Sequence, residues 1–537
     1  MLMTTAALGR RKFLLGSAAT VAVASVGLDT RSAAAARVDA YPFQLGVASG
    51  DPLPDAVVLW TRLVRDLLDP ASMGSVPIAV QWVVAEDAAC RRVVRSGTAT
   101  AHPALAHSVH VDVRGLRPDR VYHYRFKAGA YASEVGTTRT APALDAAVST
   151  LKVGVVNCQD WQNGYWPAYD HLAEEDLDVV LHLGDYIYEY DPASVYPDRL
   201  HNPPETLGLQ QLLTLTDYRN RQALYKTDPA IQRAHGRFPW VLTWDDHEVE
   251  NNYAGLVDEI DDTGEMYQDP VEFAAQRTNS YQAYYEHMPI RPKVRLGSPD
   301  YKIYRSFDYG DLLRVAVLDT RQYRTDQPGG FSTDFGDEQA GRANVDGTMT
   351  GAEQEAWLQS QLDSSPALWN AIAQQTLMTR VRFPNVDPTV PLPFIANLDQ
   401  WDGYFPQRQR IVDFLDQAAV SNPVVLAGDI HSSWFSDINL DPDDPESKTV
   451  AAEFAATSIS SDFPIDYDAL IKAFNPVENP QVKYFDGSRR GYLRMTIDRS
   501  QWLTEARTVS TIAEREAPVE TTAGYVTLAG DPGVLPA

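Results

Sequence analysis

Four short segments of this 537-residue chain gather side chains of the types that bind metal ions in proteins. In chain order they are Asn157-Cys158-Gln159-Asp160, Gly184-Asp185-Tyr186-Ile187-Tyr188, Trp244-Asp245-Asp246-His247-Glu248 and Gly428-Asp429-Ile430-His431. Together they offer a thiol, phenols, imidazoles and carboxylates, and they hold two of the chain's 11 histidines. Because such donors favour different metals, the four segments predict a site with more than one metal ion.

The second segment carries a clue to the metal. Asp185 could bridge two cations through its two oxygens, and Tyr188, three residues later, could supply a phenolate. Phenolate suits a hard, highly charged ion such as ferric iron better than zinc or magnesium. The alternative is a helix-capping aspartate followed by a tyrosine that only packs.

The third and fourth segments add carboxylates and imidazoles. Asp246 and His247 lie among further carboxylates, which repel one another unless a cation or a shared proton compensates them. Asp429 and His431 are two residues apart, so they share one face if the strand continues. The alternatives are a solvated acidic turn for the third segment and a loop aspartate with an unrelated histidine for the fourth.

The chain has only two cysteines, Cys90 and Cys158. Cys158 could be a nucleophile or a metal ligand, since the thiolate serves in both roles. No nucleophile elbow of the G-x-S-x-G type lies nearby, which favours the ligand role. A disulfide is an alternative in an exported protein, but the two residues fall in different predicted domains, so we expect a structural role for Cys90.

Two further segments could support the site. Arg321 follows an apolar run, and its guanidinium fork matches the geometry of phosphate. Asp402, in Trp401-Asp402-Gly403-Tyr404, could form a wall of the site. The alternatives are a surface salt bridge for Arg321 and a packing turn for Asp402.

The elements that position these residues are readable from hydrophobic patterns. Each of the four segments follows an apolar run that reads as a buried strand: Lys152–Val156, Asp178–Leu183, Trp240–Thr243 and Val424–Ala427. Sites in open α/β sheets form at the carboxyl ends of strands. Amphipathic helices are expected at 165–175, 209–225, 270–287, 351–362 and 406–417. Strands alternating with helices predict a mixed α/β domain.

We expect four regions along the chain. Residues 1–36 read as a targeting signal, 40–142 as an all-β domain, 150–510 as the catalytic domain and 511–537 as a tail. In the second region, a turn leading into Tyr122-His123-Tyr124-Arg125 resembles the late strands of a fibronectin type III sandwich.

Composition and the N-terminus limit the function further. A net charge of −26 argues against nucleic-acid binding, and 44% hydrophobic residues argue against disorder. Arg10-Arg11 begins a twin-arginine pattern, followed by an apolar stretch to about Leu28 and small residues up to Ala36. This predicts export by the twin-arginine machinery to a secreted, cell-wall or periplasmic location. The alternative, a stable membrane anchor, is disfavoured because the stretch is short for a membrane span.

The order of the motifs resembles the calcineurin-like metallophosphatase superfamily, with D-x-H, G-D-x-x-Y, G-N-H-[DE] and G-H-x-H. Three positions depart from that pattern: Cys158 replaces the first aspartate, Asp246 the asparagine and Asp429 the first histidine. With the twin-arginine signal and segments such as Phe43–Pro52 and Val58–Arg62, these departures make the chain resemble the PhoD-type alkaline phosphatases.

The resemblance implies a fold, a metal set and a reaction. The expected fold is a four-layer αββα sandwich preceded by a small fibronectin III-like β-sandwich. The expected ligands are Cys158, Asp185, Tyr188 and His431 for Fe³⁺, and Asp185, Asp246 and Asp429 for Ca²⁺. Asp402 and Asp160 are candidates for a second calcium, and His247 would contact the phosphate or the leaving group. A metal-bound hydroxide would attack phosphorus.

The substrate class stays open at this point. The first hypothesis is an exported phosphomonoesterase acting on small-molecule phosphate esters. The second is a secreted phosphodiesterase of the phospholipase D type on the same scaffold, with a lipid phosphate ester as substrate. A third, of another class, is a calcium-dependent binding protein that cleaves no phosphate ester.

Overall fold

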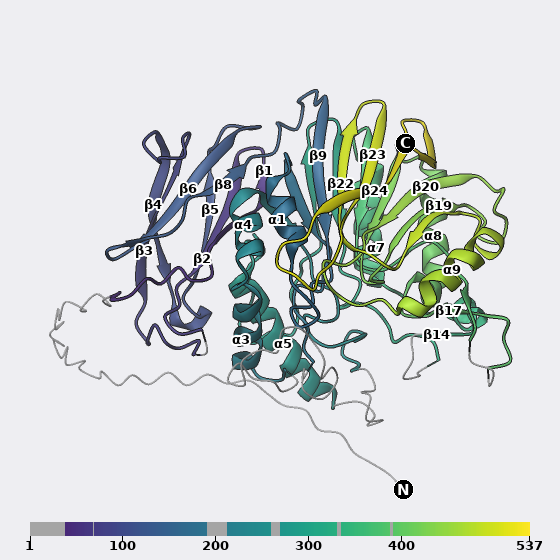
Figure 1. The fold of residues 1–537 in the computed structure, drawn as a ribbon, viewed down its shortest axis with the longest axis horizontal. Helices are drawn as coiled ribbons and strands as arrows, with labels where there is room; N and C mark the ends of the chain where they lie inside the picture. Colours follow the sequence, from purple (N-terminus) through teal and green to yellow (C-terminus); the bar gives the residue numbers. More distant parts are fainter. Residues whose placement is uncertain (1–37, 68, 191–211, 259–268, 330–334, 387–389) are drawn as a thin grey trace, which may run out of the picture. The chain divides into compact units, whose positions relative to one another are not determined.

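The computed structural model describes residues 38–67, 69–190, 212–258, 269–329, 335–386 and 390–537 (Figure 1). The predicted twin-arginine signal, residues 1–36, lies outside these ranges. Within them, no helix is long and apolar enough to cross a membrane. Residues 37–537 form one compact unit, and both cysteines, which lie in the described part, are free thiols.

A ten-stranded mixed sheet carries, at its strand ends, three of the four segments predicted to bind metal. Its spatial order is β25 (Asp531–Pro536), β24 (Val519–Leu528), β23 (Gln501–Val509), β22 (Arg490–Asp498), β9 (Thr150–Val156), β10 (Val179–His182), β11 (Pro239–Leu242), β1 (Val47–Leu53), β2 (Ala56–Arg62) and β5 (Ser108–Arg114). Strands β9, β10, β11 and β1 are parallel. Strands β10 and β11 are buried along their whole length, as parallel strands are when both faces of the sheet are covered.

A seven-stranded sheet holds the fourth segment. Its order is β12 (Arg305–Tyr309), β13 (Leu313–Val317), β15 (Trp369–Ala373), β18 (Pro423–Ala427), β20 (Thr449–Ala455), β19 (Ser433–Asn439) and β21 (Val482–Asp486). Strands β13, β15, β18 and β20 are parallel. Val155 and Leu181 of the first sheet share one buried core with Val315 and Val424 of the second, so the two sheets face each other.

Helices cover the outer face of each sheet. The ten-stranded sheet is covered by α1 (Pro167–Glu174), α3 (Leu215–Tyr225), α4 (Pro229–Arg237) and α5 (Pro270–His287). The seven-stranded sheet is covered by α7 (Gly351–Asp363) and α8 (Phe405–Gln417), with the short α6 (Glu338–Ala343) packed against α8. Helix α5 starts where the Asp269 side chain accepts a hydrogen bond from the backbone of Val271, with Pro270 in the first turn. The predicted four-layer αββα sandwich is confirmed.

Smaller elements flank the site. A three-stranded sheet contains β14 (Phe335–Gly336), β17 (Phe394–Asn397) and β16 (Phe383–Pro384). Two 3₁₀ turns, η1 (Pro103–Leu105) and η2 (Trp401–Tyr404), lie in loops, and α9 (Ile465–Glu478) follows the loop after β20.

The N- and C-terminal regions are more closely joined to the catalytic region than their sequence patterns indicate. A separate five-stranded sheet contains β4 (Val93–Ala101), β3 (Ile78–Ala85), β6 (Val121–Ala128), β7 (Tyr131–Ala132) and β8 (Gly136–Arg139). The other N-terminal strands, β1, β2 and β5, extend the ten-stranded sheet instead. Residues 511–537, expected to be a tail, supply β24 and β25 of that same sheet, and Figure 1 shows these strands and β1 on opposite sides of β9.

Candidate metal centre

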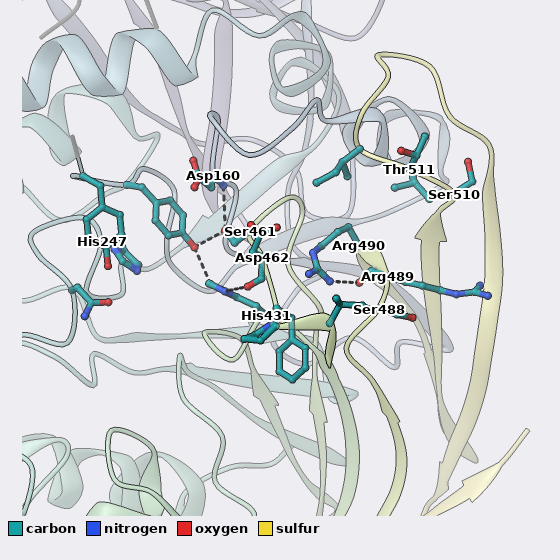
Figure 2. Close-up of a pocket in the computed structure, with 18 of the residues that line it drawn as sticks. Asp160, His247, His431, Ser461, Asp462, Ser488, Arg489, Arg490, Ser510 and Thr511 are labelled. Atoms are coloured by element: carbon teal, nitrogen blue, oxygen red, sulfur yellow. Dashed lines mark hydrogen bonds between the residues drawn. The ribbon is translucent and has the colours of Figure 1, made fainter. Parts of the chain in front are cut away.

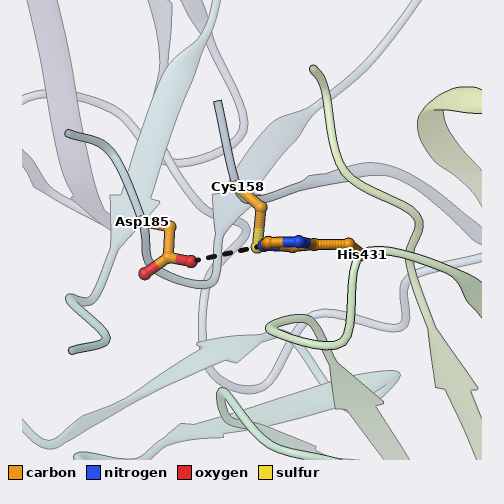
Figure 3. A group of neighbouring side chains, drawn as sticks. All are labelled: Cys158, Asp185 and His431. Carbon is orange, nitrogen blue, oxygen red and sulfur yellow. Dashed lines mark ion pairs between the residues drawn. The ribbon is translucent and has the colours of Figure 1, made fainter. Parts of the chain in front are cut away.

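The loops after β9, β10, β11 and β18 bring the predicted ligands together. Potential donor atoms lie within 4.8 Å of one another in three groups: Cys158, Asp185 and His431; Asp185, Asp246 and His247; and Asp245, Asp246 and Asp429. Figure 3 shows the first group, whose three side chains come from three separate loops. Because Asp185 and Asp246 each belong to two groups, the three groups form one continuous centre.

Four residues of this centre have a left-handed backbone. The φ angles are +53° at Cys158, +55° at Asp185, +62° at Asp429 and +54° at His431. This conformation costs about 1–2 kcal/mol for a residue with a Cβ atom. It persists where the surrounding structure enforces it, and such strain clusters at functional sites. The strain therefore favours a functional role for these four residues over a packing role.

A glycine lets two of the loops approach closely. Gly184, just before Asp185, has φ +114°, and a side chain at this position would collide with Asp245 in the loop after β11. Only glycine combines this angle with this contact. The glycine of the Gly-Asp-x-x-Tyr segment is thus explained by the joining of the loops after β10 and β11.

His431 presents one ring nitrogen to the centre. Its Nδ1 lies 2.7 Å from the backbone oxygen of Asp462, so Nδ1 donates a proton there and Nε2 is left as an acceptor. Nε2 lies 3.0 Å from Tyr188 Oη, which in turn lies 3.0 Å from Asp185 Oδ2. Burial lowers the pKa of His431 to about 4, so the ring is neutral, as a metal ligand must be.

Burial raises the pKa of the anionic donors. It holds the pKa of the Cys158 thiol and of the Asp185 and Asp245 carboxyls well above their usual ranges, and neighbouring carboxylates add to the effect. The pKa of Asp246 is instead lowered, because Arg321 and His247 outweigh its burial.

The donor set fits cations. Among the described residues, one buried oxygen each of Asp185, Asp245 and Asp246 has no hydrogen-bond partner. Leaving buried carboxylate oxygens unpaired is unfavourable, and a bound cation would remove that penalty. One side of the centre offers thiol, phenol and imidazole, and the other offers carboxylate oxygens only. The second set is the type that calcium prefers.

Arg321 lies inside the centre. Its side chain is fully buried, and its guanidinium donates to the carboxylates of Asp245, Asp399 (2.8 Å) and Asp429 (2.7 Å). These carboxylates come from three different loops. In this arrangement the guanidinium faces carboxylates and is not open to a phosphate, so its geometry is that of a positioning residue.

Two glutamates hold the loops and the catalytic histidine candidate. Glu248 accepts hydrogen bonds from the backbone nitrogens of Asp185 (3.1 Å) and Asp245 (2.8 Å), which ties the loops after β10 and β11 together. Glu189 Oε2 lies 2.8 Å from His247 Nδ1. Burial lowers the pKa of His247, but the carboxylates of Glu189, Asp246 and Asp185 outweigh it and raise the pKa well above its usual range.

The centre opens on two sides. A cavity of about 1140 Å³ is lined by Tyr188, His247 and His431 together with Arg489 and Arg490 (Figure 2). A groove of about 790 Å³ also reaches the centre, and beyond the acidic residues of the centre its wall is largely apolar, with Phe335, Phe383, Leu392, Ile395 and Phe463. A substrate therefore has two approaches to the centre: a cavity with arginines in its wall and a largely apolar groove, which meet at His247 and His431.

Comparisons with known proteins identify the family. The PhoD-like phosphatase family model matches residues 153–506, and the model of the PhoD-like phosphatase N-terminal domain matches residues 29–142. This chain belongs to the PhoD-like phosphatase family. Alkaline phosphatase D of Bacillus subtilis (strain 168) is 43% identical over 529 residues, which cover 96% of this chain and 87% of the relative. A solved structure of PhoD matches with a TM-score of 0.85 and 42% identity over 93% of each chain.

Family membership decides between the functional classes. This PhoD-like protein is a phosphatase, and therefore a hydrolase, rather than a calcium-dependent binding module. Its resemblance to PhoD-type enzymes, seen in the motifs, is confirmed.

The predicted site residues of this PhoD-like phosphatase are mostly brought together. The centre contains Cys158, Asp185, Tyr188, Asp246, His247, Arg321, Asp429 and His431. Asp160 lines the cavity. Asp402 is not part of any of the three donor groups: it pairs with Arg408 (2.6 Å) and accepts a hydrogen bond from the backbone of Val381.

Sequence reasoning missed four acidic residues of the PhoD-like site. They are Glu189, Asp245, Glu248 and Asp399. Asp245 and Glu248 lie inside a segment that was singled out, but nothing in the sequence assigned them separate roles. Glu189 directly follows Tyr188, and Asp399 lies three residues before Asp402. Both are therefore next to residues that the sequence did indicate as candidates.

Proposed function

We propose that this PhoD-like phosphatase is an exported, metal-dependent alkaline phosphatase that hydrolyses phosphate monoesters. The observation that carries the proposal is the continuous centre of three donor groups at the wall of a large cavity. The twin-arginine pattern at Arg10-Arg11 motivates export to a secreted, cell-wall or periplasmic location.

The donor chemistry supports iron on one side and calcium on the other. Ferric iron would be held by Cys158, Asp185, Tyr188 and His431, and calcium by Asp185, Asp246 and Asp429. When bound, such cations lower the pKa of water and neutralise charge on the phosphate. The carboxylate that both sides share, Asp185, would keep the two ions in a fixed relation.

The chain's own residues would handle the leaving group and orient the ligands. Glu189 holds His247 through Nδ1, which leaves the other ring nitrogen, Nε2, as the proton donor on the cavity side. We infer that this proton passes to the departing alkoxide oxygen. Arg321 acts at a distance from the substrate, because it holds the carboxylates of the calcium side in place.

A second candidate, phosphodiester hydrolysis, is favoured by the two-sided opening. The arginine-lined cavity and the largely apolar groove share Asp462 and Phe463 as well as His247 and His431 in their walls. A diester has a substituent on each side of phosphorus, and the two spaces could take one each. Among diester substrates, a lipid phosphate ester would suit the apolar groove.

The decisive experiment combines metal analysis with two substrates. Iron and calcium would be measured in the purified mature protein, and release of p-nitrophenol would be compared between the phosphate monoester and the bis-ester. Faster monoester turnover by a protein containing both metals supports the first function, and faster bis-ester turnover supports the second. A His247→Ala variant with unchanged metal content should lose most turnover, more on a poor leaving group than on p-nitrophenol. Equal losses on both would contradict its role as proton donor.

A further inference from the structure

Two adjacent arginines lie where the chain enters β22 and line the cavity beside the metal centre. Figure 2 shows their side chains leaving this turn in opposite directions. Arg489 forms an ion pair with Glu520 of β24, and 43% of its side chain is exposed. Arg490 turns to the side of the cavity where Asp462 and His431 lie.

Arg490 is a partly buried cation with unused donors. Its Nη1 donates to the backbone oxygens of Gly487 (3.2 Å) and Arg489 (2.9 Å). Among the described residues, no carboxylate is within ion-pair distance of it, and no group accepts from Nε or Nη2; Asp462 and Asp486 act on it only as more distant charges. Partial burial of a guanidinium without an anionic partner is unfavourable, and it lowers the pKa of Arg490. Together with its free donors facing the cavity, this arrangement points to a ligand that supplies the anion.

The other arginines near the centre are already paired. Arg321 donates to three carboxylates, and Arg324 pairs with Asp399 at 2.7 Å. Neither of them lines the cavity. Of the arginines described around this site, Arg490 therefore has the free donors and the position to meet an incoming anion.

The turn that carries Arg490 is held in place. Thr457 Oγ1 donates to the backbone oxygen of Arg489 (2.7 Å), and the backbone nitrogen of Gly491 donates to Ser458 (2.9 Å). Asp486 caps the turn by accepting from the backbone and hydroxyl of Ser488, each at 2.8 Å. A binding group held this way loses little conformational entropy when its ligand arrives.

The charge of Arg490 influences the pKa of a residue in the metal centre. It is one of the causes that lower the pKa of His431, and Cys158 and Tyr188 in turn act on Arg490. The arginine therefore lies near the iron side of the proposed site but makes none of its contacts. An anion bound between Arg490 and the centre would be shared by both.

We propose that Arg490 is the substrate-binding cation of the cavity, and that its guanidinium donates to the anionic oxygens of the phosphoryl group. The inference rests on the proposed phosphatase function and names the residue that recognises the substrate. A planar fork with two free donors fits two phosphoryl oxygens at once. This places the phosphate-binding role at Arg490, whereas the sequence pattern assigned it to Arg321.

The test measures binding of inorganic phosphate to the holoprotein by calorimetry, without turnover. Three variants are compared with the wild type: Arg490→Gln, Arg490→Lys and the matched control Arg489→Gln. Iron, calcium and the melting temperature are measured for each. We expect Arg490→Gln to weaken phosphate binding about tenfold to a hundredfold, the range for losing hydrogen bonds to a charged group. Arg490→Lys should restore part of the affinity, and Arg489→Gln should leave it unchanged.

The outcomes separate this inference from the proposed function. Phosphate affinity that is unchanged in Arg490→Gln, or equally weakened in Arg489→Gln, overturns the assignment. Loss of metal or of the folded state in both Arg490 variants also overturns it, because the arginine would then act through the structure. A wild type that contains its metals but neither binds phosphate nor hydrolyses esters would defeat the proposed function itself.

Discussion

Lys226 is a fully buried lysine, and among the described residues no carboxylate pairs with it. Its Nζ lies 3.0 Å from Tyr186 Oη and 4.7 Å from the centroid of the Trp60 ring. The nearby His182 and His235 supply no compensating anion: burial lowers their pKa values, so both rings are neutral. Burial lowers the pKa of Lys226 from 10.5 to about 7.

The lowered pKa sets both the sign and the size of an effect on stability. Below about pH 7 the lysine is protonated in the folded and the unfolded chain, and the full burial penalty applies. Between about pH 7 and 10.5 the unfolded chain holds the extra proton, so the free energy of unfolding rises with pH. Above that range the lysine is neutral in both the folded and the unfolded chain. At about 1.4 kcal/mol per unit, the penalty is about 5 kcal/mol.

Lys226→Met removes the charge and keeps the length of the side chain. The lost hydrogen bonds, to Tyr186 (3.0 Å) and to His235 (3.5 Å), are worth about 1–2 kcal/mol together. We expect the variant to be more stable than the wild type by up to about 4 kcal/mol near neutral pH. Near pH 10 we expect the wild type and the variant to have similar free energies of unfolding.

Urea unfolding followed by tryptophan fluorescence, from about pH 6.5 to 10, measures this difference. Groups common to both proteins cancel in the comparison. Lys293→Met, at an exposed lysine, is the matched control and should show no pH-dependent difference. If the difference between wild type and Lys226→Met stays constant with pH, Lys226 titrates alike in both states and the reasoning fails.

Four further predictions concern the metal centre. Tyr188→Phe should weaken the visible absorbance of the purified protein, because a phenolate–iron pair absorbs visible light; an unchanged spectrum removes Tyr188 from the ligands. Cys158→Ala should lose iron and activity while Cys158→Asp keeps part of both, and equal metal content in the two would contradict a ligand role. Removing calcium with EGTA should abolish activity until calcium is added back; full activity after verified removal excludes calcium. Arg321→Ala should lower the free energy of unfolding of the metal-free protein by about 3–5 kcal/mol, since it leaves buried carboxylates uncompensated. An unchanged melting temperature would refute this.

The strands and helices that the sequence indicated best are those with a strong local pattern. The apolar runs before the four segments coincide with β9, β10, β11 and β18, and the helix expected at 270–287 coincides with α5. Apolar strand patterns and the Asp-Pro start of a helix depend on neighbouring residues only. Helices α4 and α9 were missed, because α4 is short and polar and α9 exposes several of its apolar residues.

Features that depend on contacts between residues far apart in the chain could not be predicted from the sequence. The joining of β1, β2 and β5 to the ten-stranded sheet needs contacts between remote segments, which no local pattern encodes. Arg321 was expected to face a phosphate, but the direction of its guanidinium is set by the carboxylates of Asp245, Asp399 and Asp429 around it. The sequence therefore indicated that an arginine lies at the site, but which groups it contacts could be seen only in the folded structure.

The order of strands in the large sheet also determines when each strand can pair during synthesis of the protein. The loop carrying Cys158 follows β9, and β9 pairs along one edge with β22, residues 490–498. A ribosome builds the chain from its N-terminus, so β9 keeps that edge open until those residues have emerged. Open strand edges invite wrong pairings, and contacts this distant form slowly. The predicted ligands are all made once His431 has been added, but the strand that carries Cys158 gains its second neighbour only when β22 follows.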